Sequence, residues 1–186
     1  MNLVADYQNA NGTKTRHLRN TPATASWLPP SHRYYKVNID GAVFSKRKQA
    51  GAGVVIKDSE GEVIAALSKR WPHPLGALEA EAKALEVGAL FAWEVGIREA
   101  EFEGDSLAVC NALQGLVSPP SSVVNVLAGF MDHASHLRGW KVSHINRQGN
   151  VPAHLLAQHA QHVVDYVAWL EECPSLIEHA CNEDKL

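Results

Sequence analysis

The chain has 186 residues and a mass of 20.3 kDa, which is enough for one well-buried core but too little for two ordinary domains. Its formal net charge of -3 argues against the broad basic surface with which many proteins hold nucleic acids. Residues 1–20 lack the apolar core of a signal peptide, and no apolar run approaches the roughly 20 residues of a membrane helix, so we expect an intracellular protein of the cytoplasm or nucleus with no membrane contact.

Composition divides the chain into three parts. Residues 1–30 contain Asn, Gly, Thr and Pro without apolar periodicity, which predicts a flexible lead-in. A folded domain is expected over residues 31–166, followed by an acidic C-terminal tail at residues 167–186. Residues 1–36 hold five Lys or Arg against one Asp, and two interpretations fit this charge: an arm that binds phosphates, or a solvated linker.

Hydrophobic periodicity predicts the elements of the folded domain in chain order. Alternation predicts strands at residues 34–44, 50–57, 62–71, 98–104 and 140–146, and helical patterns cover residues 76–96, 106–115, 121–137 and 153–166. Short connections join the first three strands into an antiparallel meander, whereas helical crossovers make the later strands parallel. The expected fold class is α/β, with a five-stranded mixed sheet covered by helices.

Asp40 is the acidic residue that fits its surroundings least. It follows Ile39 in a strand suited to the covered centre of a sheet, and burying an unpaired carboxylate costs several kcal/mol. Either Asp40 holds a cation, or it accepts hydrogen bonds from backbone amides at a bulge.

The first predicted helix carries two glutamates that cannot share a face. Glu79 and Glu81 are two residues apart, which is about 200° of helical rotation. Glu81 lies in line with the small and apolar stripe of Ala84, Leu85 and Gly88, so it is the inward carboxylate. We expect Glu79 to be solvent-exposed and to form an ion pair with Lys83.

Asp105 ends the fourth predicted strand and begins a helix, where ligand-contacting groups collect in sheets with parallel neighbours. A helix cap is the other role that fits this position. Taken together, Asp40, Glu81 and Asp105 can supply the hard oxygen ligands that two divalent cations need for phosphodiester cleavage. Mg²⁺ or Mn²⁺, as two ions, is therefore the expected cofactor.

The chain resembles the type-1 ribonuclease H superfamily, and in particular the plant ribonuclease H-like modules of non-LTR retroelement proteins. The matching stretches are WLPP at 27–30, KVNIDGAVF at 36–44, GAGVVIKDSEG at 51–61, AEAKAL at 80–85, FEGDS at 102–106, INRQGNVPAHLLA at 145–157 and WLEECP at 169–174. The resemblance implies a ribonuclease H-like fold for residues 31–166. It also implies a hydrolase, specifically an endonuclease that cleaves the RNA strand of an RNA–DNA hybrid.

The family's catalytic set has four carboxylates, and three of them carry over to Asp40, Glu81 and Asp105. The fourth is replaced, since the motif that begins the family's last helix ends in His154 where an aspartate is usual. The resemblance thus implies that His154 completes the catalytic and metal-binding set. Two alternatives remain, a catalytically weakened nucleic-acid-binding module and a protein-interaction domain of a retroelement-derived product. A monomer is expected.

Overall fold

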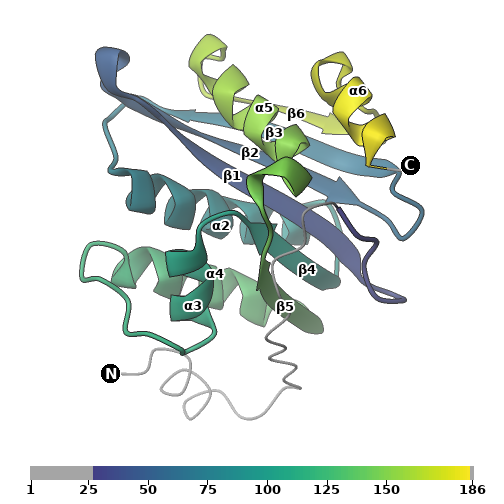
Figure 1. Ribbon diagram of the computed structural model, residues 1–186, viewed down its shortest axis with the longest axis horizontal. Helices are drawn as coiled ribbons and strands as arrows, with labels where there is room; N and C mark the ends of the chain where they lie inside the picture. Colours follow the sequence, from purple (N-terminus) through teal and green to yellow (C-terminus); the bar gives the residue numbers. More distant parts are fainter. Residues whose placement is uncertain (1–26, 185–186) are drawn as a thin grey trace.

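Six strands form one sheet in the computed structural model, which describes residues 27–184 (Figure 1). The strands are Tyr35–Phe44 (β1), Gln49–Lys57 (β2), Val63–Trp71 (β3), Glu99–Gly104 (β4), Gly139–His144 (β5) and Tyr166–Leu170 (β6). The helices are Ala77–Glu94 (α2), Leu107–Leu113 (α3), Val124–Ser135 (α4), Val151–His159 (α5) and Ser175–Glu183 (α6), with 3-10 turns at Ser45–Arg47 (η1), Arg147–Gly149 (η2) and Ala160–His162 (η3).

The strand order across the sheet is β5-β4-β1-β2-β3-β6. β1, β2 and β3 form an antiparallel meander, while β4 runs parallel to β1 and β5 runs parallel to β4. This arrangement confirms the predicted mixed α/β sheet. The central parallel pair matters for the site, because the carboxyl end of β4 at Gly104 lies opposite Ile39 in the middle of β1.

The sheet has six strands rather than the predicted five. β6 pairs antiparallel with β3, so the sheet continues past residue 166, where the acidic tail was expected to begin. The predicted last helix is also too long, since α5 ends at His159 and one 3-10 turn carries the chain to His162. Val163 then adopts an extended conformation, as the β-branched pair Val163 and Val164 favours.

The remainder of the expected tail is folded as well. α6 buries Ile177 and Cys181, which pack in one apolar cluster with Val55 of β2 and Leu156 of α5. The high acidity of residues 167–186 misled the prediction, because Glu178 and Glu183 lie on the exposed side of an amphipathic helix and Asp184 forms an ion pair with buried Lys57. The C-terminal segment therefore belongs to the fold.

Helices cover both faces of the sheet. α2 and α4 lie on one face, and α5 and α6 lie on the other (Figure 1). The larger apolar cluster fills the space between the sheet and the α2 and α4 layer, where Ile39, Phe102 and Phe130 are buried. α5 approaches β2 closely at Gly53, since a Cβ at that position would lie 2.1 Å from the carbonyl oxygen of Ala153.

Both ends of the described chain meet at Lys57, whose side chain is fully buried. The Lys57 ammonium lies 4.9 Å from the ring centroid of Trp27 and 2.5 Å from a carboxylate oxygen of Asp184. Trp27 is itself buried and donates from Nε1 to the side-chain oxygen of Asn38 at 3.2 Å. Residues 27–30 of the predicted lead-in are thus part of the fold, while the rest of that prediction, residues 1–26, lies outside the described residues.

Among residues 27–184, no helix combines the length and the apolarity needed to cross a membrane.

The Lys57 junction generates a stability prediction. Replacing Asp184 by Asn leaves the buried Lys57 ammonium without a counter-charge, so the free energy of unfolding should fall by about 3 kcal/mol in urea titrations. The double variant Lys57→Met/Asp184→Asn should regain much of this loss, because it replaces the buried ion pair with an apolar contact. An Asp184→Asn variant as stable as the parent would contradict a structural role for this ion pair.

Candidate metal centre

The register between two parallel strands places Asp40 beside Asp105. Ile39 of β1 lies opposite Gly104 of β4, so the next residue of each strand is an aspartate. Asp40 is only 3% exposed, and Asp105 is half-buried. His144, at the end of β5, donates from Nε2 to the backbone oxygen of Asp105 at 3.1 Å. This bond fixes the loop that carries the second carboxylate.

Glu81 reaches the same place from α2, and Gly41 makes this possible. A Cβ at Gly41 would lie 2.6 Å from the carbonyl carbon of Ala80 and 2.7 Å from the amide nitrogen of Glu81, so only glycine lets α2 pack this closely on β1. The Gly41 amide then donates to Glu81 Oε2 at 3.2 Å. The helix is thereby seated with its inward carboxylate next to Asp40.

The three carboxylates converge as the sequence predicted. Asp40, Glu81 and Asp105 each offer one ligand oxygen, and these oxygens all lie within 4.8 Å of one another. Among the described residues, this is the group of His, Cys, Asp and Glu side chains that could hold a metal ion. Three hard oxygen donors fit Mg²⁺ or Mn²⁺ better than a softer metal.

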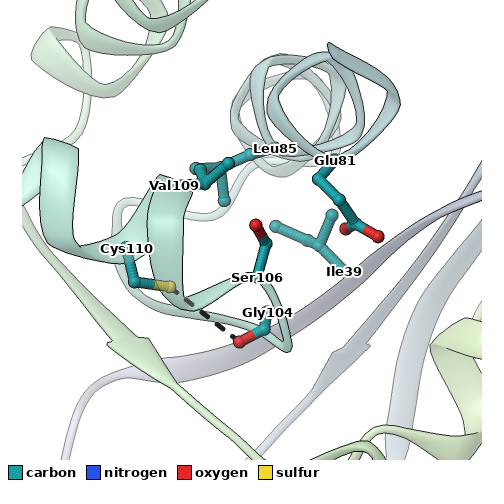
Figure 2. Close-up of a pocket in the computed structure, with 7 residues that line it drawn as sticks. All are labelled: Ile39, Glu81, Leu85, Gly104, Ser106, Val109 and Cys110. Carbon is teal, nitrogen blue, oxygen red and sulfur yellow. Dashed lines mark hydrogen bonds between the residues drawn. The ribbon is translucent and has the colours of Figure 1, made fainter. Parts of the chain in front are cut away.

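Glu81 lies at the rim of a small hollow with mainly apolar walls. Figure 2 shows its carboxylate beside Ile39, with Leu85 and Val109 to the left in the same view. The base of the hollow includes Cys110, whose thiol lies 3.9 Å from the Gly104 carbonyl oxygen. These walls remove water from one side of the Glu81 carboxylate, which disfavours its charged form.

Burial and mutual repulsion raise two of the carboxyl pKa values. Burial raises the pKa of Glu81 to about 9, and the charges of Asp40 and Asp105 add to the effect. Burial also raises the pKa of Asp40 to about 6, although a hydrogen bond from His154 acts in the opposite direction. A cation bound among the three carboxylates would remove the repulsion, so the electrostatics of the cluster favour metal binding.

His154 stands beside this group rather than within it. Its Nδ1 lies 2.9 Å from Asp40 Oδ2, and because the carboxylate is an acceptor, Nδ1 carries the proton and donates. The three converging oxygens do not include a His154 nitrogen. The structure therefore gives the residue implied as the fourth ligand a different contact, a hydrogen bond to the first ligand.

Asn150 positions His154 by fixing the start of α5. Its side-chain amide donates to the backbone oxygen of Ile39 at 2.8 Å, immediately before Asp40, and its backbone oxygen accepts from the His154 amide at 3.0 Å. Asn150 is fully buried, and its side-chain oxygen has no partner among the described residues. The first turn of α5 is thus tied directly to the strand that bears Asp40.

Arg147 is a functional candidate that reasoning from the sequence overlooked. Its Nη2 lies 3.1 Å from His154 Nε2, and its charge lowers the pKa of both Asp40 and Glu81. Arg147 opens the INRQGNVPAHLLA stretch that carries part of the resemblance, so its place in that motif was the available signal.

The choice between the two glutamates was right, but the details for Glu79 were wrong. Glu79 is half-buried rather than solvent-exposed, and its Oε2 accepts from the Gly76 amide at 2.8 Å, which caps α2. Lys83 forms its ion pair with Glu86 instead. Glu79 therefore accepts a capping hydrogen bond from Gly76 instead of forming the predicted ion pair.

The raised pKa of Glu81 predicts a pH-dependent gain in stability for Glu81→Gln. Between its ordinary pKa of 4.5 and the folded value of about 9, the folded state holds a proton that the unfolded state releases, so this carboxyl destabilises the metal-free protein increasingly as pH rises. In chelator, the melting temperature of Glu81→Gln should exceed that of the parent by more at pH 8.5 than at pH 5.

Glu79→Gln is the matched control, because glutamine also caps a helix at this position and no buried charge is removed. The melting difference between this variant and the parent should vary little with pH. A Glu81→Gln difference that stays constant or shrinks from pH 5 to pH 8.5 would contradict the electrostatic account of the cluster.

Comparison with known proteins agrees with the resemblance in the sequence. A curated protein of Arabidopsis thaliana with the name "Putative ribonuclease H protein" is 30% identical over 139 residues, which make up 72% of this chain and 22% of that protein. The chain thus matches about a fifth of the length of this relative.

Solved structures share the fold. Ribonuclease H1 of the halophilic archaeon Halobacterium salinarum has a TM-score of 0.65 and 22% identity, covering 69% of this chain and 98% of that one. LC11-RNase H1, solved in complex with an RNA/DNA hybrid, has a TM-score of 0.62 and 22% identity, covering 68% and 95%. Residues 38–160, more than half of the chain, match the family described as reverse transcriptase-like. The chain therefore belongs to the reverse transcriptase-like family, as a module with the ribonuclease H fold.

Proposed function

We propose that this chain is a metal-dependent endonuclease that hydrolyses the RNA strand of RNA–DNA hybrids and acts as a monomer. The observation that carries the proposal is the convergence of ligand oxygens of Asp40, Glu81 and Asp105 within 4.8 Å, where β4 ends beside the middle of the parallel strand β1. Two divalent cations, Mg²⁺ or Mn²⁺, are the proposed cofactors, and the three carboxylates would hold them. When bound, such cations lower the pKa of an attacking water and stabilise the charge on the phosphate and the leaving oxygen.

The side chains around the cluster have distinct proposed roles. Asp40, Glu81 and Asp105 neutralise and orient the cations. His154 holds the Asp40 carboxylate by its Nδ1 hydrogen bond, and its other ring nitrogen would be the atom that contributes to a second cation. Arg147 is exposed next to the cluster, so its guanidinium is available to a substrate phosphate.

The names of the relatives support the proposed substrate. The Arabidopsis protein is named as a ribonuclease H, and one structural relative was solved with an RNA/DNA hybrid. Family membership together with a plant relative supports an origin in a plant retroelement. Recognition of RNA is expected through its 2′-hydroxyls in the minor groove of the hybrid.

The second candidate function is a catalytically weakened module that binds nucleic acid. His154 favours it, because a neutral imidazole brings no negative charge to the second metal and its Nδ1 is already engaged by Asp40. Cleavage assays separate the two candidates, since only the first requires turnover.

The direct test is cleavage of an end-labelled RNA–DNA hybrid in Mg²⁺ and, separately, in Mn²⁺. The parent should cut the RNA strand, and Asp40→Asn should lower the rate by more than roughly 100-fold, because even outer-shell partners of a metal contribute 10- to 100-fold. Asp40→Asn also controls for contaminating nuclease. Equal cutting by parent and Asp40→Asn would remove the proposed role of the cluster, and binding without cutting would favour the second candidate.

Substitutions of His154 test how the site manages its second cation. His154→Asp should increase cleavage in Mg²⁺, since a carboxylate adds the charge and the oxygen donor that Mg²⁺ prefers. His154→Ala should lower cleavage in Mn²⁺, because nitrogen suits Mn²⁺ and because Asp40 loses its hydrogen bond. An Ala variant that cleaves as well as the parent in both metals would show that His154 has no role in the site.

A further inference from the structure

Three consecutive cations occupy the turn between β1 and β2. Lys46, Arg47 and Lys48 are all exposed, and we call them the cationic turn. Arg47 donates from Nη1 to the backbone oxygen of Gln161 at 2.7 Å, which ties the turn to the segment after α5. No salt bridge among residues 27–184 involves Lys46 or Lys48. Their charges are therefore available to an outside anion.

The two segments that meet at this turn contain no acidic residue. Residues 41–57 hold four Lys or Arg and no Asp or Glu, and residues 146–164 hold Arg147 and three histidines, again with no Asp or Glu. Three acidic residues border these segments in the sequence: Asp40 belongs to the carboxylate cluster, Asp58 accepts hydrogen bonds from the amides of its own turn, and Asp165 pairs with Lys69 at 3.2 Å. The surface between these segments thus lacks the negative charges that would repel a polyanion.

This surface lies on the α5 face of the sheet, and Asp40 of the carboxylate cluster contacts α5 through His154 at 2.9 Å. α5 packs on β1 and β2, Arg147 lies at its beginning next to Asp40, and the cationic turn lies near its end (Figure 1). Ser45 lies five residue steps after Asp40 along extended β1, which corresponds to about 17 Å. Along one strand of a duplex this distance spans about five phosphates, at roughly 3.4 Å for each.

We propose that the cationic turn binds the phosphate backbone of a nucleic-acid duplex whose scissile phosphate lies at the carboxylate cluster. This inference rests on the proposed function and adds a second, distant contact to it. Two positive contacts near the two ends of α5 set the path of the bound strand: Arg147 near its beginning and the cationic turn near its end. The turn compensates for the net negative charge of the whole chain by concentrating positive charge where the duplex runs.

The test is equilibrium binding of a labelled RNA–DNA hybrid to the full chain in chelator, where the hybrid is not cut, over a range of salt concentrations. The variant is Lys46→Gln/Lys48→Asn. Asn is chosen because Lys48 has a φ of 51°, a left-handed conformation that Asn tolerates well. Arg47 is left in place because it anchors the turn.

Loss of two phosphate contacts should weaken binding at least tenfold at about 0.1 M salt and should reduce the slope of log affinity against log salt by about 2. The matched control Lys83→Gln/Arg138→Gln removes the same charge from the α2 and α4 side of the sheet, and it should retain the affinity and slope of the parent. Melting curves of both variants check that the fold is intact.

The outcomes separate this inference from the proposed function. If the parent binds and cleaves the hybrid but the Lys46→Gln/Lys48→Asn variant binds with unchanged affinity and slope, the cationic turn is not a contact and only this inference is overturned. Equal losses in the test and control variants would also overturn it, because net charge alone would then explain binding. A parent that neither binds nor cleaves the hybrid contradicts both.

Discussion

Repulsion among three gathered carboxylates is the constraint around which the rest of this structure is arranged. Burial and like charge together raise the pKa of Glu81 to about 9 and that of Asp40 to about 6, so the cluster is unfavourable as three free anions. It persists because rigid elements fix each carboxylate from a different direction. The β1 and β4 register aligns the two aspartates, and the close contact of α2 with Gly41 brings in the glutamate.

Outer contacts hold the same three groups in place. His144 bonds to the backbone of Asp105, Asn150 ties α5 to the residue before Asp40, and His154 bonds to the Asp40 carboxylate. All three residues belong to the part of the chain from β5 to α5, and each lies more than a hundred residues after Asp40 in the sequence. β5 pairs with β4, the strand that precedes Asp105. The site thus depends on long-range packing, and the cation Arg147 beside it belongs to the same segment.

The sequence permitted prediction of the three carboxylates because each occupies a position where periodicity fixes the direction of the side chain. Asp40 follows an alternating apolar strand, and Glu81 shares a helical stripe with Leu85 and Gly88. The hydrogen bond of His154 to Asp40 could not be predicted in this way, because it depends on the angle at which α5 crosses β1. The contact of Arg147 with His154 could not be predicted either, because a long arginine side chain at this position could equally well extend into solvent.

The errors in the fold have a similar physical origin. β6 is an edge strand whose exposure alternates, but its sequence YVAWL is apolar throughout, so no polar residue marks the outward positions. α6 was hidden by its acidic outer face, although Ile177 and Cys181 lie on a consistent inner side. Trp27 was likewise assigned to the polar lead-in, because its hydrogen bond to Asn38 and its ring contact with Lys57 are not visible in the sequence.

The central claim is that Asp40, Glu81 and Asp105 form a divalent-cation site, and anomalous X-ray diffraction from crystals soaked in Mn²⁺ tests it most directly. The account predicts an anomalous difference peak among the three carboxylates, at roughly 2.0 to 2.3 Å from the nearest oxygens, that is absent from crystals of the Asp40→Asn variant. Crystals that show Mn²⁺ elsewhere on the molecule and none at the cluster, at millimolar Mn²⁺ and a mildly alkaline pH, would contradict it.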